Sequence, residues 1–186
     1  MIVGDALRAW LAEPRSSRLE RIVCRLGEGR HRCPRSARLT RAEGLVGDRW
    51  SADPRPAPDR QLTLMDARVV RRLLAHAAAR PGAPAPELAL GEPHEALDRP
   101  GDNLVIDLPT GLATLPPGTR LRIGSAVVET NDTPHAGCKK FEARFGADAL
   151  AWVNDRAHAD LKLRGLNAIV VEDGEVHEGD LVVVLP

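Results

Sequence analysis

Residues 130–141 (TNDTPHAGCKKF) hold a cysteine, a histidine and two lysines within one short segment. Cys138 stands where a predicted strand gives way to a helix predicted over residues 139–144, which Gly146 ends. The first amides of a helix have no partners within the helix and carry the positive end of its dipole, so they stabilise a nearby anion. Cationic side chains act in the same direction. These surroundings favour thiolate over thiol, and a thiolate binds soft metals or attacks electrophiles.

An alternative interpretation of Cys138 is structural. A free cysteine often behaves as a small buried hydrophobe, with its charged neighbours pointing to water. Lys139 and Lys140 are consecutive, so they cannot both face the thiol. From the residues alone, both interpretations stand.

The other cysteines and histidines are assigned no chemistry. Cys24 alternates with Ile22 on the apolar face of a predicted strand and is expected in the core. Cys33 is placed in a loop, without a role. The histidines that lack a partner at metal-binding spacing are His31, His76, His94 and His158.

The overall composition excludes several classes of function. The 26 basic and 26 acidic residues balance, so the net charge gives no reason to expect a nucleic-acid or membrane partner. No segment approaches the ~18 apolar residues that cross a bilayer, and residues 1–11 lack the basic start and apolar run of a secretory signal. Three cysteines without CxxC spacing argue against a disulfide framework and a zinc site. We therefore expect a cytoplasmic protein.

The elements that must position Cys138 are mostly short strands. Alternating apolar residues and turn signals predict strands over residues 19–26, 36–39, 61–65, 103–108, 119–123, 126–130, 167–171, 175–176 and 181–185, with a strand, turn and strand within 36–50. Asp173-Gly174 predicts a hairpin turn with positive φ angles. Loops are predicted over residues 27–35 and 51–60, and residues 81–101, rich in Pro, Gly and Ala, are assigned no structure.

Only a few helices interrupt these strands. They are predicted over residues 3–12, 66–80 and 139–144, with Asp66 capping the second and Pro81-Gly82 ending it. Many short strands with few helices predict a β-rich barrel and disfavour a doubly wound α/β sheet. The sequence has no GxGxxG or Walker-type phosphate loop.

Six segments, taken in order, resemble the MOSC family, the domain named after the C-terminal part of eukaryotic molybdenum-cofactor sulfurases. The segments are GLVGDRW (44–50), DRQLTLMDA (59–67), GDNLVID (101–107), GTRLRIG (118–124), PHAGCKKF (134–141) and RGLNAIVVEDGEVHEGD (164–180). Stand-alone bacterial proteins of this type are known. The resemblance extends from about Leu19 to the C-terminus.

The resemblance implies a twisted MOSC-type β-barrel with a few peripheral α-helices, over residues 19–186. Residues 1–18 would form an N-terminal helical extension. It also implies that Cys138 is either the thiolate ligand of molybdenum in a pyranopterin cofactor (molybdopterin) or a persulfide carrier. Direct binding of pyridoxal phosphate is not expected, because no lysine precedes Lys139.

Further site residues follow from the matching segments. Candidates for the cofactor phosphate are Arg49, Arg60, Lys139 and Lys140. Asp48 could instead pair with Arg49 or Arg60 to hold its loop. Asn103 could contact the pterin or cap a turn. His135 could orient or protonate a substrate, or support the site from behind.

Two segments depart from the family pattern. Cys33-Pro34-Arg35 stands where members often carry Pro-Met or a longer acidic segment, and Pro-Gly-Asp-Asn (100–103) replaces a Phe-Gly-Glu-Asn-like sequence. These departures leave the pocket wall and the substrate open.

Three functions follow as hypotheses. The first is a molybdenum-cofactor protein, the terminal component of an electron chain that reduces N-hydroxylated or related small molecules. A separate electron-donor protein is implied, because the sequence has no flavin or iron–sulfur motif. The second is a non-redox module that carries sulfur as a Cys138 persulfide received from a sulfur donor. The third is a hydrolase using Cys138 and His135, whose spacing suggests no nucleophile–base geometry.

Overall fold

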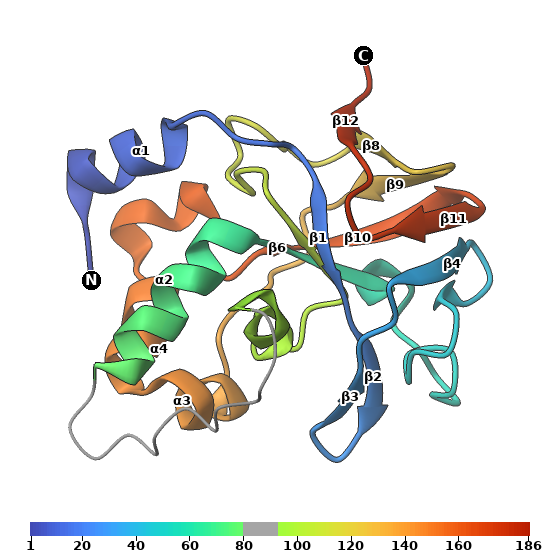
Figure 1. The fold of residues 1–186 in the computed structure, drawn as a ribbon, viewed down its shortest axis with the longest axis horizontal. Helices are drawn as coiled ribbons and strands as arrows, with labels where there is room; N and C mark the ends of the chain where they lie inside the picture. The colour runs from blue at the N-terminus through green and yellow to red at the C-terminus, as the bar shows by residue number, and fades with distance from the viewer. Residues whose placement is uncertain (80–92) are drawn as a thin grey trace.

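A computed structural model describes residues 1–79 and 93–186 (Figure 1). Its main feature is a curved seven-stranded sheet, in which only β6 and β7 run parallel. In spatial order the strands are β1 (Leu19–Ile22), β7 (Leu104–Ile106), β6 (Leu62–Asp66), β10 (Leu166–Glu172), β9 (Ala126–Thr130), β8 (Arg120–Ile123) and β12 (Val182–Val184).

The two edges of this sheet meet and nearly close it into a barrel. The backbone N–H of Leu19 donates to the carbonyl of Asp180 at 2.8 Å, and that of Val182 donates to Ser17 at 2.7 Å. Arg18 and Leu181 form an isolated bridge between the same edges. The predicted β-rich, twisted barrel with peripheral helices is confirmed.

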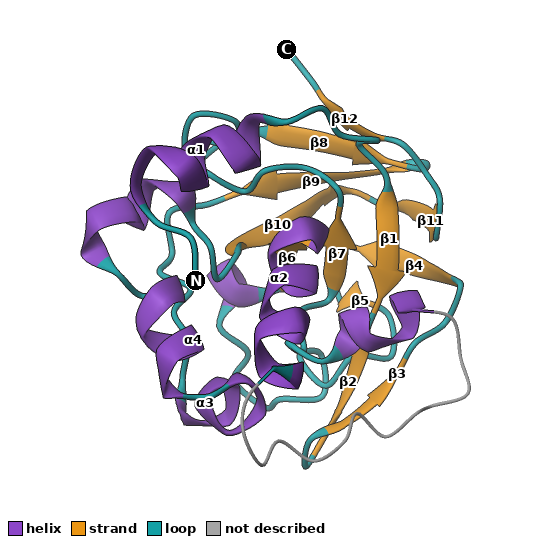
Figure 2. Ribbon diagram, turned by 60° about the vertical axis from the view of Figure 1, so that its left-hand side comes forward, coloured by secondary structure: helices purple, strands orange, loops and turns teal. Residues whose placement is uncertain are grey.

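Four helices gather on one side of the barrel: α1 (Gly4–Ala12), α2 (Ala67–Ala78), α3 (Lys139–Phe145) and α4 (Ala147–Val153) (Figure 2). Strand β6 contributes to two hydrophobic clusters, one inside the barrel and one between the sheet and the helices. Leu62 and Leu64 pack inside the barrel, whereas Met65 faces the helices. Alternation along the strand therefore supplies both layers.

Smaller sheets and 3-10 turns complete the fold. The strands β4 (Ser36–Thr40), β5 (Gly44–Leu45) and β11 (Gly174–His177) form a three-stranded sheet, and β2 (Cys24–Gly27) pairs with β3 (Arg30–Arg32). The 3-10 turns are η1 (Pro58–Arg60), η2 (Pro93–Asp98) and η3 (Arg156–Leu161). Figure 1 shows the β2–β3 hairpin projecting beyond the barrel, on the side where α3 lies.

The prediction of a loop over residues 27–35 is wrong for its first half. Arg25 pairs with His31 across an antiparallel hairpin. Gly27, Glu28 and Gly29 all have positive φ angles, which turn the chain tightly. Glycine and charge were interpreted as loop composition, but here they build a hairpin turn.

The predicted hairpin at Asp173-Gly174 is also wrong. Strand β10 pairs with β6 and β9, and β11 leaves this sheet to pair with β4, so Gly174 lies opposite Leu39. Gly174 is not among the glycines with positive φ. A Cβ at this position would collide with the backbone of Ser125 and Ala126, so close approach, not turn geometry, requires the glycine.

The predicted N-terminal cap of α2 is confirmed. The Asp66 side chain caps α2 by accepting from the N–H of Arg68 at 2.8 Å. The helix ends at Ala78. Its predicted last residue, Arg80, and the predicted stop at Pro81-Gly82 lie outside the described residues, as do residues 81–92 of the unassigned stretch 81–101. Helix α4 was not predicted.

The N-terminal helix is integrated into the fold. Leu7 and Leu11 of α1 are buried in the same cluster as residues of α2, α3 and α4. The division into residues 1–18 and 19–186 stays a prediction. In the part of the chain that the structure describes, no helix has the length and apolar character needed to cross a membrane.

Candidate functional site

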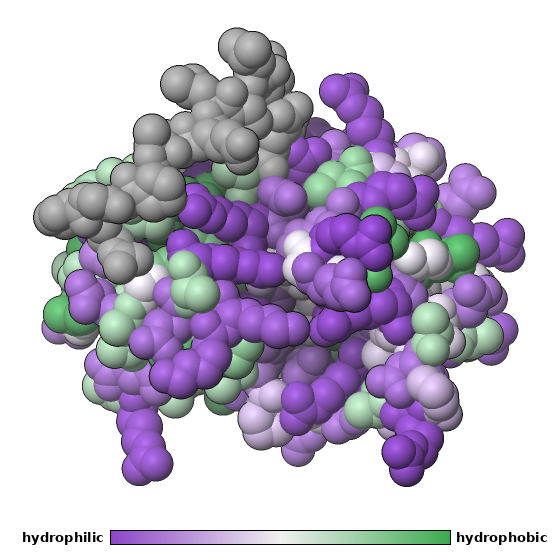
Figure 3. Space-filling view, turned by 90° about the horizontal axis from the view of Figure 1, so that it is seen from below, coloured by the Kyte–Doolittle hydropathy of each residue, from purple (hydrophilic) through white to green (hydrophobic). Residues whose placement is uncertain are grey.

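A cleft lies between the β2–β3 hairpin and α3, on a face where hydrophilic side chains predominate (Figure 3). It has two lobes that share six lining residues: Arg25, Arg49, Thr63, His135, Cys138 and Arg164. The hairpin lobe, of about 160 Å³, is also lined by Arg30, His31, Gly101, Asp102, Lys140 and Arg144. The loop lobe, of about 550 Å³, is also lined by Trp50, Asp53, Arg60 and Asn167. Cys138 therefore lies where the two lobes meet.

The backbone before Cys138 is held by Asn154, the residue that ends α4. The N–H of Gly137 donates to Asn154 Oδ1 at 2.8 Å, and Asn154 Nδ2 donates to the Gly137 carbonyl at 3.2 Å. A Cβ at Gly137 would lie 2.6 Å from Leu150 Cδ1, so any larger residue would displace the Leu150 side chain. This clamp fixes Cys138 at the start of α3.

The thiol of Cys138 is exposed and poised to ionise. Its pKa lies below the ordinary value, chiefly because of the backbone N–H of Phe141, which outweighs the opposing effect of partial burial. The N–H of Lys140 and the charges of Arg164 and Lys140 add to the effect. Its side chain makes no capping hydrogen bond of ordinary geometry, so these groups act by their field. The sequence-based expectation of a thiolate-favouring environment matches this direction.

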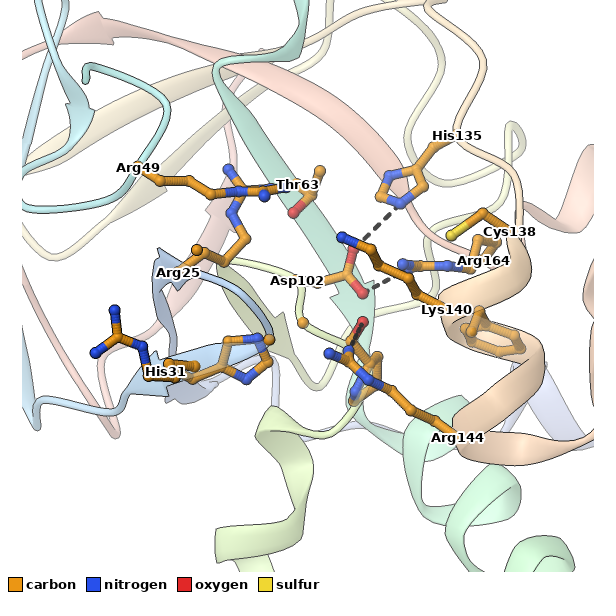
Figure 4. Close-up of a pocket in the computed structure, with 16 residues that line it drawn as sticks. Arg25, His31, Arg49, Thr63, Asp102, His135, Cys138, Lys140, Arg144 and Arg164 are labelled. Atoms are coloured by element: carbon orange, nitrogen blue, oxygen red, sulfur yellow. Dashed lines mark hydrogen bonds and ion pairs between the residues drawn. The ribbon is translucent and has the colours of Figure 1, made fainter. Parts of the chain in front are cut away.

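Behind Cys138 lies a buried group of three side chains, shown in Figure 4. Arg164 Nη1 donates to Asp102 Oδ2 at 2.6 Å. His135 Nε2 lies 3.4 Å from Asp102 Oδ1, which is long for a hydrogen bond. Among the described residues, Asp102 Oδ1 and His135 Nδ1 have no hydrogen-bond partner.

The charges of this group follow from its burial. Burial opposes ionisation of Asp102, but Arg164 and then His135 outweigh it and hold the pKa of Asp102 below its ordinary value. Burial lowers the pKa of His135 to about 4, although Asp102 acts in the opposite direction. At neutral pH the site therefore holds a charged Asp102–Arg164 pair beside a neutral histidine.

The four predicted phosphate-binding residues differ in which lobe of the cleft they line. Arg49 lines both lobes and Arg60 lines the loop lobe. Lys140 lines the hairpin lobe. The side chain of Lys139 is 94% exposed, pairs with Glu142 at 3.0 Å and lines neither lobe. A cofactor contact by Lys139 stays a prediction.

Asn103 and Asp48 hold the frame behind the cleft. Asn103 is fully buried, lines neither lobe, and donates to Asp48 Oδ2 at 2.9 Å while accepting from the N–H of Thr63. Asp48 pairs with Arg25 through two contacts of 2.9 Å. The prediction that Asp48 pairs with Arg49 or Arg60 is wrong, because the β2–β3 hairpin brings Arg25 to it instead. Its expected role in holding a loop is what the contacts show.

Several residues of the cleft were not predicted from the sequence, among them Arg25, His31, Asp102, Arg144 and Arg164. Asp102 and Arg164 stand inside two of the segments that carry the family resemblance, so a signal for them was present. His31 was considered and given no role. The hairpin that carries it had been interpreted as a loop. The residues described contain no cluster of three or more metal-binding side chains of the His, Cys, Asp or Glu type.

Comparisons with known proteins agree with the barrel. A match to the MOSC domain covers residues 55–183, more than half of the chain. No curated protein sequence matches.

Several solved structures share the fold. YiiM from Escherichia coli is similar with a TM-score of 0.54 and 21% identity, over 91% of this chain and 70% of that one. The YuaD protein from Bacillus subtilis has a TM-score of 0.52 and 14% identity, over 91% of this chain and 96% of that one. A protein described as hypothetical has a TM-score of 0.58 and 21% identity, over 91% of this chain and 68% of that one. From the extent of the sequence match, the chain belongs to the MOSC domain family.

Proposed function

We propose that this chain binds a molybdenum cofactor in the cleft, with Cys138 as the thiolate ligand of the metal. The MOSC family is associated with molybdenum-cofactor binding. The observation that carries the proposal is the position of Cys138, a thiol of lowered pKa at the junction of two cationic lobes. A thiolate is a ligand type suited to a soft metal centre.

The groups around Cys138 fit a pyranopterin cofactor. Asp102 Oδ1 and His135 Nδ1 are buried and lack partners among the described residues, so N–H or O–H groups of a ligand would satisfy them. The loop lobe has the volume of a small-molecule site. A pterin that entered this lobe would lie next to Cys138.

The phosphate of the cofactor is assigned to Arg49 and Arg60. Both line the loop lobe, and no described carboxylate forms an ion pair with either. Guanidinium groups bind phosphate through paired N–H donors. Lys139 and Lys140 are less suited, since neither lines this lobe.

The proposed reaction is reduction of an N-hydroxylated small molecule. When bound, the cofactor supplies a metal that changes oxidation state. Conversion of an N–OH group to N–H consumes two electrons and two protons and releases water. The electrons come from a separate donor protein, and we place the protein in the cytoplasm, where the three free cysteines would stay reduced.

His135 serves as an orienting group in this proposal. Because its pKa is lowered to about 4, it is neutral at neutral pH and is not a ready proton source before a ligand binds. A neutral imidazole can still donate one hydrogen bond and accept another. Its unpartnered Nδ1 is suited to holding a substrate or cofactor N–H.

The test is the molybdenum content of protein purified from a host that makes the cofactor. Wild type should contain close to one molybdenum per chain, and Cys138→Ser should lose most of it. Arg120→Gln is the control, because Arg120 lies on β8 and lines neither lobe. Wild-type protein without molybdenum would overturn the proposal.

A second candidate function uses the same thiol as a sulfur carrier. The exposure of Cys138 favours it, because a protein sulfur donor could reach the thiol. Incubation with a cysteine desulfurase would then add one sulfur to Cys138, reversible by a thiol reductant. Absence of that mass gain, with molybdenum present, would exclude it.

The cysteine hydrolase hypothesis finds no support in the contacts. No hydrogen bond joins Cys138 and His135 in the described structure, and Nε2 of His135 lies beside Asp102 instead. A neutral histidine whose pKa is lowered to about 4 is also a weak base for a thiol.

A further inference from the structure

The floor of the hairpin lobe brings together two side chains from distant parts of the chain. Gly101 has a φ of +83°, and a Cβ there would lie 3.0 Å from Arg144 Nη1 and 3.4 Å from His31 Nε2. A Cβ would therefore press on the end of Arg144 and touch His31, and the positive φ itself disfavours any residue other than glycine. Arg144 of α3 and His31 of β3 therefore approach the same stretch of backbone at Gly101. Figure 4 shows these two side chains pointing toward one another.

Arg144 is anchored without being neutralised. Its Nη1 donates to the carbonyls of Arg99 at 2.9 Å and Pro100 at 3.2 Å. No carboxylate pairs with it among the described residues. The carbonyls fix one nitrogen, which leaves a positive charge and further N–H donors beside the lobe.

His31 presents a polar ring to the same space. Its side chain is 13% exposed, and Nδ1 lies 4.0 Å from Asp98 Oδ2, too far for a hydrogen bond. Burial, followed by the charge of Arg144, lowers the pKa of His31. A neutral ring next to a cation contributes an N–H donor without adding charge repulsion.

The other charged residues that line the hairpin lobe are mostly cationic. Arg30, Arg49 and Lys140 also line it, whereas Asp102 is its one lining carboxylate among the described residues. Asp102 is already paired with Arg164. The lobe therefore has an excess of positive charge, which favours an anion.

The size of the hairpin lobe separates it from the cofactor site. Its volume of about 160 Å³ suits a carboxylate or phosphate group, whereas the loop lobe, of about 550 Å³, has room for a pterin. Cys138 and His135 line both, so a ligand group in the hairpin lobe would lie next to the proposed metal ligand.

We infer that the hairpin lobe is an oxyanion subsite, in which Arg144 and His31 hold a carboxylate or phosphate group of the substrate. This inference rests on the proposed function, because it names the substrate class of the same cleft. His31, on the β2–β3 hairpin, lies outside the residues 55–183 that match the family. The β2–β3 hairpin would thus contribute to substrate selectivity from outside the matched residues.

The first experiment measures anion binding by the full chain without cofactor. Inorganic phosphate and acetate are titrated while binding is followed by calorimetry. Arg144→Gln should weaken phosphate binding roughly tenfold or more, because a charge-assisted pair is lost. His31→Gln should weaken it by a smaller factor. The control Arg120→Gln, on β8 and outside both lobes, should leave it unchanged. Phosphate affinity that is unaltered in both Arg144→Gln and His31→Gln would overturn the inference.

The second experiment separates a substrate group from the phosphate of the cofactor. Both variants, purified from a cofactor-producing host, should keep the wild-type molybdenum content. Arg144→Gln should raise KM for a carboxylate-bearing aromatic amidoxime and leave KM for the uncharged amidoxime unchanged. Loss of molybdenum in Arg144→Gln would show that the lobe holds the cofactor, and would overturn the inference.

Two controls keep these results interpretable. Arg144→Lys retains the charge and should recover part of the phosphate affinity, whereas His31→Gln tests the lobe from a different element if Arg144→Gln misfolds. If wild type contains no molybdenum, the proposed function fails. The phosphate titration would still decide whether Arg144 and His31 form an anion site.

Discussion

Arg164 Nη1 holds one oxygen of Asp102 at 2.6 Å, while the other oxygen of this buried carboxylate has no hydrogen-bond partner among the described residues. The arginine fixes the carboxylate and keeps it charged. An unpaired buried oxygen is unfavourable in the free protein, and a ligand N–H would relieve this. The pair therefore stabilises the barrel, and under the proposed function its free oxygen also takes part in recognition.

Breaking the Asp102–Arg164 pair should destabilise the protein strongly. Asp102→Ala leaves the Arg164 guanidinium buried and unpaired, so the free energy of unfolding should fall by about 3–5 kcal/mol. Urea unfolding followed by circular dichroism measures the change. Arg120→Ala, which breaks an ion pair whose arginine side chain is 57% exposed, should have a much smaller effect.

The two partners should also be coupled. In a double-mutant cycle, Asp102→Leu combined with Arg164→Met should be less destabilising than the sum of the single changes, because neither charge is left alone. Additive effects would show that the short contact contributes little to stability.

Neutral His135 should make the folded state sensitive to acid. Burial lowers its pKa to about 4 when folded, against an ordinary value of 6.5. Between these values the unfolded chain binds more protons, so stability rises with pH across this window and is lost as pH falls through it. From about pH 7 to about pH 5 this residue should remove about 2 kcal/mol of stability.

His135→Gln isolates this effect, since glutamine keeps polar atoms but does not titrate. The difference in free energy of unfolding between wild type and variant, measured with urea at several pH values, should change by about 2 kcal/mol between about pH 7 and about pH 5. A difference that is independent of pH would mean that His135 keeps an ordinary pKa in the folded protein.

The barrel could be predicted because its strands alternate locally. Burial along β8, for example, switches at every residue from Arg120 to Ile123, which a sequence pattern captures. The pairing of strands could not be predicted in the same way. The sequence around Gly174 is typical of a turn. A glycine is required there, however, because the backbone of Ser125 and Ala126, far away along the chain, leaves no room for a Cβ.

The same contrast applies to the cleft. Cys138 could be recognised as a candidate site residue because the features that favour its thiolate, the adjacent lysines and the start of the following helix, are next to it in the sequence. His31 and Arg144 could not, because each is unremarkable in its segment and they meet only over Gly101. Asn103 was expected near the cofactor from its segment, but its side chain is used within the protein by Thr63 and Asp48.

The three cysteines should differ widely in reactivity. The pKa of Cys138 is lowered, chiefly by the N–H of Phe141, whereas burial raises the pKa of Cys33 to about 11 and also raises that of Cys24. Iodoacetamide at neutral pH should therefore modify Cys138 first, because the thiolate is the reactive form. Mass spectrometry of peptides measures the rates. Equal rates for Cys33 and Cys138 would contradict the arrangement described.

Asn154 should affect the pKa of the Cys138 thiol without touching it, because it forms hydrogen bonds with both the N–H and the carbonyl of the preceding residue, Gly137. Asn154→Ala removes both contacts, so stability should fall by about 1 kcal/mol. More tellingly, the pKa of Cys138 should rise, because the thiol would no longer be held near the amides of α3. Asn154→Asp loses the donor to the Gly137 carbonyl and adds a negative charge near the thiol, so the pKa of Cys138 should rise in this variant as well. The pH dependence of alkylation measures both changes in pKa. If Asn154→Ala alkylates like wild type, the position of Cys138 is set by α3 alone, and the clamp serves only to join α4 to the preceding loop.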